Sequence, residues 1–292
     1  MRKVVDSNFL QSEELRDYLS KSPRNFAVLT DYASMEAYKG NTLVSICRSM
    51  QILANFPRQV IILKGTQKVC GLKGRSSGLQ RRMIDEIQTR GFGEWCRQLA
   101  AAERGDIRMQ NQLLEHGREA DAQMDRVLAD ARKFSPGLEE VSKTFTPVEL
   151  KTLRNDAPYT EELFGKITRN ILIMAAFMFA GHPRVAKLPP TAELPNTFIF
   201  RVALCAYLLA LRWISVGGAR NVNPERIRND IIDLNFAAFA TFFDGILTSD
   251  LKVRQIYHDA HFLLRKFFSR DKLHNQAGGA VNPRAHAPRP CA

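Results

Sequence analysis

The stretch Arg2-Lys3-Val4-Val5-Asp6 decides the fold, because it joins a short apolar run to a carboxylate and is followed by a helical pattern over residues 10–19. Similar apolar runs recur at residues 25–30 and 58–63, and a helical pattern between them covers residues 42–55. Short strands that alternate with helices across short connections are typical of βαβ units and of a parallel sheet. The N-terminal region therefore predicts an α/β fold with a parallel central sheet.

The C-terminal part of the chain returns to this pattern. A helical pattern over residues 224–242 precedes a compact apolar strand at residues 244–248, and an amphipathic helical pattern follows over residues 251–268. The long segment between the two regions shows helical patterns without an obvious strand. We therefore expect strands from both ends of the chain to complete one sheet.

These patterns divide the chain into a core, an insertion and a tail. After about residue 269 the sequence consists mainly of Gly, Pro, His and Arg, with little apolar surface to bury. The predicted parts are an α/β core at residues 1–70 and 221–270, a mostly helical insertion at 71–220, and a disordered tail at 271–292. Within the insertion, residues 79–133 are predicted to be helical and supply no obvious strand.

The chain is strongly basic, with 42 Lys and Arg residues against 30 Asp and Glu residues and a formal net charge of +12. Such a surface favours a polyanionic partner, so nucleic acid is the first candidate. The five cysteines lack the paired spacings of zinc or redox motifs, and no long apolar signal segment follows Met1. We therefore expect a cytoplasmic protein that is not secreted.

Two apolar segments raise the question of a membrane. Residues 171–180 form a segment shorter than the roughly 20 apolar residues that span a bilayer. Residues 198–216 are interrupted by Arg201 and Arg212, which are costly to place in hydrocarbon. Buried core helices explain both segments, and we predict no membrane association.

Four acidic residues lie near predicted strand ends, namely Asp6, Glu36, Asp233 and Asp250. In an open parallel sheet, the residues that follow the strands meet at one edge, where ligands bind. Carboxylate oxygens are suitable ligands for Mg²⁺ and Mn²⁺, so this edge predicts a metal site. Asp230 lies one helical turn before Asp233 and is an alternative ligand. The alternative role for each acid, taken singly, is to stabilise the start of a helix.

The order of these acids resembles that of the PIN-domain family of nucleases. The residues that carry the resemblance are Val4-Val5-Asp6-Ser7-Asn8, Thr30-Asp31-Tyr32-Ala33-Ser34-Met35-Glu36, Asn229-Asp230-Ile231-Ile232-Asp233 and Leu247-Thr248-Ser249-Asp250. These motifs are short and lie within about 110 residues at the two ends of the chain. The helical segment at residues 71–220 is longer than a compact PIN domain requires, and it is therefore predicted to be an insertion.

The resemblance implies a three-layer α/β/α fold that cuts RNA with one or two Mg²⁺ or Mn²⁺ ions. In that family, the acids at the positions of Asp6, Glu36, Asp233 and Asp250 bind the metal. The expected nucleophile is water, and the expected substrate is structured RNA such as tRNA. The resemblance also implies a role as a toxin or in defence, with an antitoxin or regulatory protein as partner. A homo-oligomer formed through the apolar helices is a further expectation.

A basic stretch without acidic residues follows the third predicted strand. Its members are Lys64, Lys68, Lys73, Arg75, Arg81 and Arg82. Contacts from Lys and Arg to phosphates supply much of the affinity of proteins for nucleic acid, so we predict that this stretch holds the substrate backbone near the metal. The alternative is a solvated loop without a binding role.

Two other functions fit the same sequence. One is cleavage of DNA or of branched nucleic acid, as in flap-endonuclease relatives that share the PIN core. The other is a non-catalytic scaffold that binds nucleic acid or a protein partner through its helical middle. Cleavage of labelled RNA and DNA in the presence of Mg²⁺ or Mn²⁺ distinguishes the three.

Overall fold

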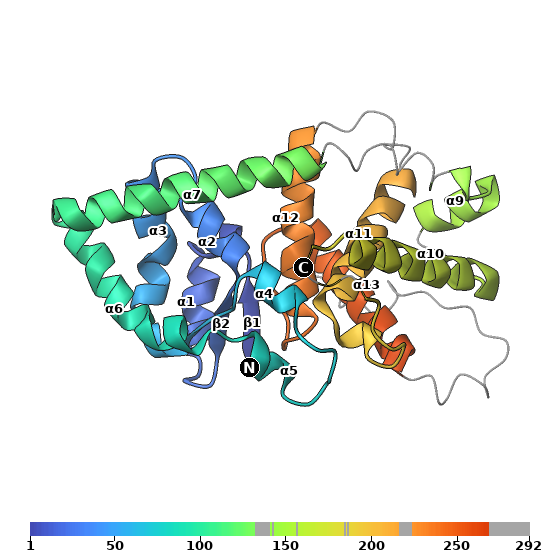
Figure 1. Ribbon diagram of the computed structural model, residues 1–292, viewed down its shortest axis with the longest axis horizontal. Coiled ribbons are helices and arrows are strands. Elements are labelled where there is room, and N and C mark those ends of the chain that lie inside the picture. Colours follow the sequence, from blue (N-terminus) through green and yellow to red (C-terminus); the bar gives the residue numbers. More distant parts are fainter. Residues whose placement is uncertain are drawn as a thin grey trace.

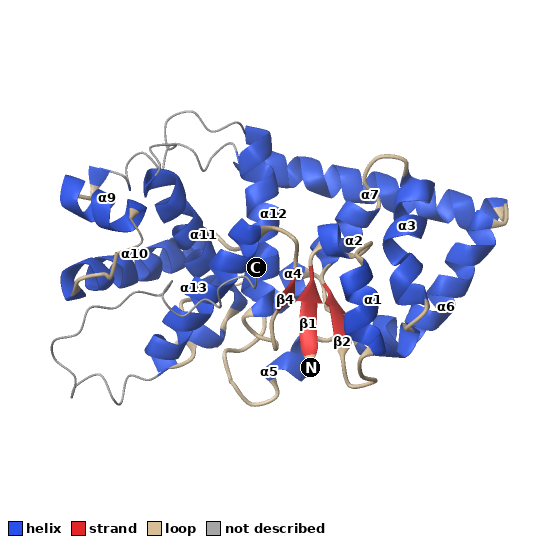
Figure 2. Cartoon of the chain, turned by 180° about the vertical axis from the view of Figure 1, so that it is seen from behind, coloured by secondary structure: helices blue, strands red, loops and turns tan. Residues whose placement is uncertain are grey.

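The structure is a computed structural model, and it describes residues 1–131, 141, 143–155, 157–183, 185, 187–215 and 224–268. The predicted disordered tail at residues 271–292 lies outside the described residues. Figure 2 shows a small group of strands surrounded by many helices. The strands are β1 (Arg2–Val5), β2 (Phe26–Leu29), β3 (Val60–Ile62) and β4 (Ile246–Leu247).

The strands form one parallel sheet in the order β3-β2-β1-β4. Val4 pairs with both Val28 and Ile246, so a strand from the C-terminal region lies beside the first strand. The prediction that both ends of the chain complete one parallel sheet is confirmed. β4 is shorter than predicted, because it begins after Gly245, whose φ of +147° is a conformation that residues with a Cβ rarely adopt.

Helices make up most of the remaining described chain. The α-helices are α1 (Glu13–Ser20), α2 (Asp31–Ala37), α3 (Thr42–Ala54), α4 (Thr66–Cys70), α5 (Leu79–Met83), α6 (Glu86–Glu103), α7 (Ile107–Ala131), α9 (Pro147–Arg154), α10 (Glu161–Ala180), α11 (Phe198–Ser215), α12 (Pro224–Ala240) and α13 (Leu251–Phe268). Short 3-10 turns are η1 (Ser7–Phe9), η2 (Pro57–Gln59) and η3 (Leu194–Asn196). α1 begins later than the predicted residue 10, because the Ser12 hydroxyl caps it by accepting from the Glu14 backbone at 3.2 Å.

The helices cover both faces of the sheet. On one face, Val5 and Leu29 pack into a core that also contains apolar residues of α1, α3 and α6. On the other face, Val4 and Val28 join a larger core that contains α11, α12 and α13. Successive strand residues therefore point into different cores, as the alternation of side chains along a strand requires. The fold is α/β, with a parallel sheet between helices (Figure 1).

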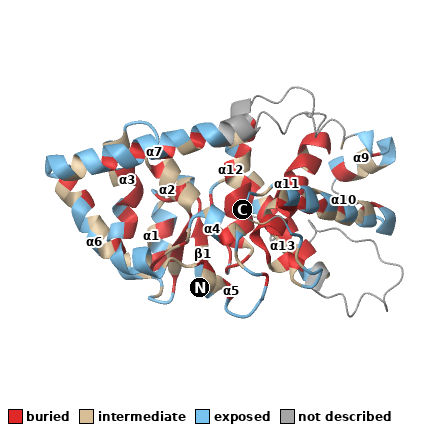
Figure 3. Cartoon of the chain, in the orientation of Figure 1, coloured by how far each residue is buried: buried red, intermediate tan, exposed pale blue. Residues whose placement is uncertain are grey.

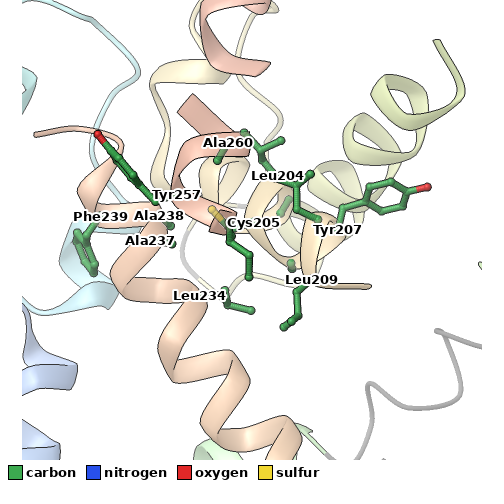
Figure 4. Close-up of a cluster of buried hydrophobic side chains, with 14 of the residues drawn as sticks. Leu204, Cys205, Tyr207, Leu209, Leu234, Ala237, Ala238, Phe239, Tyr257 and Ala260 are labelled. Carbon is green, nitrogen blue, oxygen red and sulfur yellow. The ribbon is translucent and has the colours of Figure 1, made fainter. Parts of the chain in front are cut away.

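The larger core is centred on α11. Nearly every side chain of this helix is buried, and it is largely red in Figure 3. Figure 4 shows Leu204 and Tyr207 of α11 in one cluster with Phe239 of α12 and Ala260 of α13. Because this core includes helices from the middle and from the end of the chain, it ties the two regions together.

Two helices, α10 and α11, are long and apolar enough to cross a membrane by length and composition. In the most apolar 18-residue stretch of α11, 89% of the residues are buried inside the protein, whereas the share for α10 is 28%. The burial of α11 is typical of the core helix of a globular protein. This burial supports the interpretation of α11 as a core helix, and the prediction of no membrane association stays a prediction.

The segment 79–131 is mostly helical, as predicted for residues 79–133, but it is divided into three helices. Asp85 caps the start of α6 by accepting from the Gln88 backbone at 3.1 Å. Asp106 accepts from the Met109 backbone at 3.1 Å, directly after Gly105, whose φ is +99°. Side chains that cap helices therefore divide this segment into α5, α6 and α7.

The predicted insertion at residues 71–220 contributes to both cores. Phe92 and Leu99 of α6 lie in the core with α1 and α3, whereas α10 and α11 line the other core. α7 runs from the end of α6 to α12, across the top of the view in Figure 1. The segment is therefore packed against the α/β elements along its length, and its description as an insertion stays a prediction.

Asp259 is an acidic side chain in the interior of α13, with 1% of its surface exposed. Burial raises its pKa to about 7, against the hydrogen bond from Gln255 and the charge of Arg212. Because the folded pKa exceeds the unfolded value, the folded chain binds more protons, and stability falls as pH rises from about 4 to about 7.

We expect Asp259→Asn to remove this part of the pH dependence. Each pKa unit corresponds to about 1.4 kcal/mol, so the change should reach several kcal/mol. Urea unfolding of both proteins at about pH 5 and about pH 8 measures it. An equal loss of stability with pH in the two proteins would show that Asp259 does not titrate in this range.

Candidate active site

Asp6 lies at the carboxyl end of β1, next to the end of β4. It is 1% exposed, and its Oδ2 accepts a 2.6 Å hydrogen bond from Thr248 Oγ1. Thr248 directly follows β4, and the Asp6 backbone N–H donates to the Leu247 carbonyl at 2.9 Å. The pairing of strands from opposite ends of the chain therefore positions both side chains.

Thr248 also connects Asp6 to Asp250. The Asp250 backbone N–H donates to Thr248 Oγ1 at 3.0 Å, while the same hydroxyl donates to Asp6. Asp250 Oδ1 accepts from the backbone N–H groups of Lys252 and Val253, at 2.7 and 3.2 Å. Asp250 therefore caps α13, which is the alternative role predicted for it, and its Oδ2 takes no part in the cap.

Glu36 is connected to Asp6 through a hydroxyl. Ser7 Oγ donates to Glu36 Oε2 and lies 3.4 Å from Asp6 Oδ1. Glu36 stands in the last turn of α2, which is capped by Thr30 directly after β2. The alternative role of Glu36 as a partner of a helix start was therefore wrong, because the residue lies at the other end of its helix.

Asp230 and Asp233 lie one turn apart on α12 and share the ammonium group of Lys252. Lys252 Nζ donates to Asp230 Oδ1 and, at 3.1 Å, to Asp233 Oδ2, and it lies 4.0 Å from Asp250 Oδ2. Asp230 is buried, and its Oδ2 has no hydrogen-bond partner among the described residues. The Asp233 side chain is 22% exposed, so it is the better placed of the two to meet a ligand from solvent.

The acids of this site repel one another. Burial, aided by the charges of Asp6 and Asp250, raises the pKa of Asp233 to about 7 despite the opposing effect of Lys252. Burial also raises the pKa of Asp6 and that of Glu36, and the charge of Asp6 adds to the rise at Glu36. Burial alone would lower the pKa of Lys252, but its acidic partners raise it, so the ammonium stays charged. A bound cation would relieve the remaining repulsion.

The donor set suits a hard divalent cation, which prefers carboxylate oxygens. Within the described ranges, no three acidic, His or Cys side chains form a ready-made metal cage. Lys252 supplies the positive charge between Asp233 and Asp250. A divalent cation among these carboxylates would have to replace the Lys252 ammonium or bind beside it.

The predicted basic stretch divides into two groups. Lys64 Nζ donates to the Arg82 carbonyl at 2.8 Å, and the Arg82 guanidinium donates to the carbonyls of Lys73 and Arg75, at 3.1 and 2.6 Å. The side chains of Lys64 and Arg82 therefore hold the loop between α4 and α5 together. The exposed members are Lys68, Lys73, Arg75 and Arg81.

One end of the basic stretch lies away from the acids. Gln80, next to Arg81, accepts from Arg2 Nη1 at 3.3 Å at the start of β1, whereas Asp6 follows the end of that strand. At about 3.3 Å per strand residue, Arg2 and Asp6 lie roughly 13 Å apart along the chain. Figure 1 shows α5 beside the N-terminus. The role of the stretch in holding RNA stays a prediction.

Three polar residues, Ser7, Thr248 and Lys252, belong to the site although none was predicted as a ligand or catalytic residue. Ser7 and Thr248 lie within two residues of predicted acids, and that adjacency is a usable signal. Lys252 also lies two residues from Asp250, but a Lys in the first turn of a helix is usually a solvated surface residue, so its adjacency did not indicate a contact with the acids of α12. Lys39 and Arg228 supply further positive charge close to α2.

The predicted acids lie within one connected network. Asp6 is joined to Glu36 through Ser7 and to Asp250 through Thr248, and Lys252 carries the network on to the acids of α12. The network therefore unites residues from both ends of the chain at one edge of the sheet. Comparisons with family models, with curated proteins and with solved structures found no match for this chain.

Proposed function

We propose that this chain is a metal-dependent endoribonuclease with a PIN-like three-layer α/β/α core. The observation that carries the proposal is the network that joins Asp6 to Glu36 and to Asp250 through the hydroxyl groups of Ser7 and Thr248. This network lies at the carboxyl edge of a parallel sheet, where open α/β folds bind ligands. The formal net charge of +12 favours a polyanionic substrate.

The residues that would hold one or two Mg²⁺ or Mn²⁺ ions are Asp6, Glu36, Asp233 and Asp250. Bound there, a divalent cation supplies a water of lowered pKa and neutralises negative charge on the scissile phosphate. Ser7 and Thr248 orient the two carboxylates with which they hydrogen-bond. Asp230 is a positioning residue, because it is buried and holds the ammonium of Lys252.

The RNA backbone would approach the acids over Lys39 and Arg228. Lys39 is exposed, Arg228 is half-buried, and the charges of both act on Glu36. The exposed part of the basic stretch would contact phosphates farther along the substrate. A tRNA or another structured RNA is the proposed substrate, and a cytoplasmic toxin or defence nuclease, with an antitoxin or a second copy as partner, is the proposed context.

Incubation of the full chain with labelled tRNA, unstructured RNA and DNA tests this proposal. We expect RNA to be cut in Mg²⁺ or Mn²⁺ and to remain intact when EDTA removes the metal. The products should be internal fragments, because the proposed activity is endonucleolytic. The matched control is the same set of substrates with Ca²⁺, a larger oxygen-seeking cation with looser coordination geometry.

Two outcomes would reassign the function. Cleavage of DNA alone would identify a DNA or structure-specific nuclease that uses the same acids. Tight RNA binding without metal-dependent cleavage of any substrate would identify a non-catalytic scaffold, in which Lys252 neutralises the acids permanently.

A further inference from the structure

A separate cavity lies at the opposite end of β1 from the acids. Its volume is about 410 Å³, and the residues around it include Arg2, Gln80, Arg81, Asn196 and Arg201. None of the described residues that line it is acidic. The volume lies within the usual range for small-molecule sites, roughly 300–1,000 Å³. The cavity therefore combines three guanidinium groups with the size of a ligand site.

Arg201 is a buried cation, with 6% of its surface exposed. Its Nε donates to the Pro195 carbonyl at 2.8 Å, and its Nη1 donates to the carbonyl and hydroxyl of Thr241 at 2.5 and 3.1 Å. A guanidinium carries five N–H donors, and no acceptor for the two on Nη2 is found among the described residues. The guanidinium carbon lies 3.5 Å from the centroid of the Phe242 ring, which fixes its plane.

The rim of the cavity is held by Gln80. Its Oε1 accepts from Arg2 Nη1 at 3.3 Å, and its Nε2 donates to the Phe242 carbonyl at 2.5 Å. Gln80 thereby ties α5 to the start of β1 and to the turn after α12. Arg81, the next residue, is exposed, and its Nε lies 3.6 Å from Glu86. Two further guanidinium groups are therefore placed at the mouth of the cavity that contains Arg201.

We propose that this cavity binds the phosphate group of a small phosphorylated molecule, with Arg201 as the buried contact and Arg2 and Arg81 as contacts at the rim. A planar guanidinium presents paired N–H groups that match two phosphate oxygens. Three such groups suit a doubly charged phosphate monoester better than a singly charged carboxylate. The proposal does not depend on the nuclease activity, because the two sites share no residue.

The electrostatics of Arg201 support this assignment. Burial lowers its pKa to about 9, since no carboxylate among the described residues offsets the cost of removing its charge from water. A bound anion would supply the missing counter-charge. It would also give the two Nη2 donors an acceptor, because phosphate oxygens accept several hydrogen bonds each.

Calorimetric titration of the full chain with inorganic phosphate, adenosine monophosphate and adenosine tests the site. EDTA keeps metal away from the acids, and chloride holds the ionic strength constant, so that general screening of a basic protein cannot imitate binding. We expect phosphate and the monophosphate to bind and adenosine not to bind. Tighter binding of the monophosphate would support a nucleotide-like ligand, and equal binding would support free phosphate.

Two variants and a control assign the binding to this cavity. Arg81→Ala removes an exposed rim contact that the fold does not need, and Arg201→Lys keeps the buried charge but loses the planar fork. We expect each to weaken phosphate binding about tenfold, which corresponds to about 1.4 kcal/mol. Arg97→Ala is the matched control, because Arg97 is exposed and ion-paired on α6 outside the cavity. We expect this variant to bind phosphate with the affinity of the wild type.

Three results would overturn the proposal. The first is that neither phosphate compound binds, and the second is that adenosine binds as tightly as its monophosphate. The third is that Arg81→Ala and a folded Arg201→Lys both bind phosphate with the affinity of the wild type. Circular dichroism establishes whether Arg201→Lys is folded. If it is not, the Arg81→Ala result decides alone, because that side chain is exposed.

Discussion

Asp6→Asn should reduce metal-dependent RNA cleavage at least about a hundredfold while leaving the fold intact. Loss of groups that only support a metal ligand already costs roughly 10- to 100-fold in affinity or activity, and loss of the ligand itself should cost no less. The amide keeps the shape of the carboxylate and can still accept the hydrogen bond from Thr248 Oγ1. Because burial disfavours the charge at Asp6, its removal should not destabilise the protein.

A matched substitution separates the site from a general effect of charge. Asp17→Asn removes the same charge from an exposed position on α1 that takes no part in the network of acids, and it should leave cleavage unchanged. Initial rates on the same labelled RNA, with thermal unfolding of each protein, provide the comparison. Wild-type activity in a folded Asp6→Asn protein would remove Asp6 from the mechanism.

Lys252→Met should destabilise the metal-free protein by about 3 kcal/mol. Removing one partner of a buried ion pair typically costs about 3–5 kcal/mol, because the other charge is left buried without compensation. The lower end of the range applies, since the Lys252 side chain keeps 29% of its surface exposed while Asp230 is buried. Mn²⁺ should restore part of the loss, because a cation can replace the ammonium among these acids.

Two further variants isolate the interaction with Asp230. Lys252→Arg keeps the positive charge and should lose much less stability than Lys252→Met. The double variant Lys252→Met with Asp230→Asn should be more stable than Lys252→Met alone, since the amide removes the uncompensated charge. Urea unfolding with EDTA and with Mn²⁺ measures all of these. If Lys252→Met is as stable as the wild type when both are measured in EDTA, the ammonium does not hold the acids together.

The sheet was the most predictable part of the fold. Short apolar runs such as Val4-Val5 are typical of strands that are buried on both faces of a sheet. Their alternation with helical patterns indicates parallel pairing. Asp6 and Asp250 could be expected at one edge because both follow strands of that sheet. The two residues are connected through the hydroxyl of Thr248, and the sequence does not show which groups this hydroxyl contacts.

Other parts depended on contacts between distant segments. Nothing close to Lys252 in the sequence shows that it meets Asp230 on another helix, since the contact requires α12 and α13 to pack together. The sequence also did not show which members of the basic stretch are exposed and which hold the loop together. An Arg such as Arg82 has the same charge whether its guanidinium faces solvent or donates to backbone carbonyls. The breaks around α6 did have local signals, namely Asp85 and the pair Gly105-Asp106.

Acids from both ends of the chain are proposed to form one site for a divalent cation. Anomalous diffraction from crystals soaked in Mn²⁺ tests it most directly, because the signal locates the ion without reference to activity. We predict a peak bound by Asp6 and Asp250, with Lys252 moved away from Asp233 or beside the ion. A Mn²⁺-saturated crystal without a peak near these carboxylates, or with Lys252 still seated among them and the ion elsewhere, would contradict the claim.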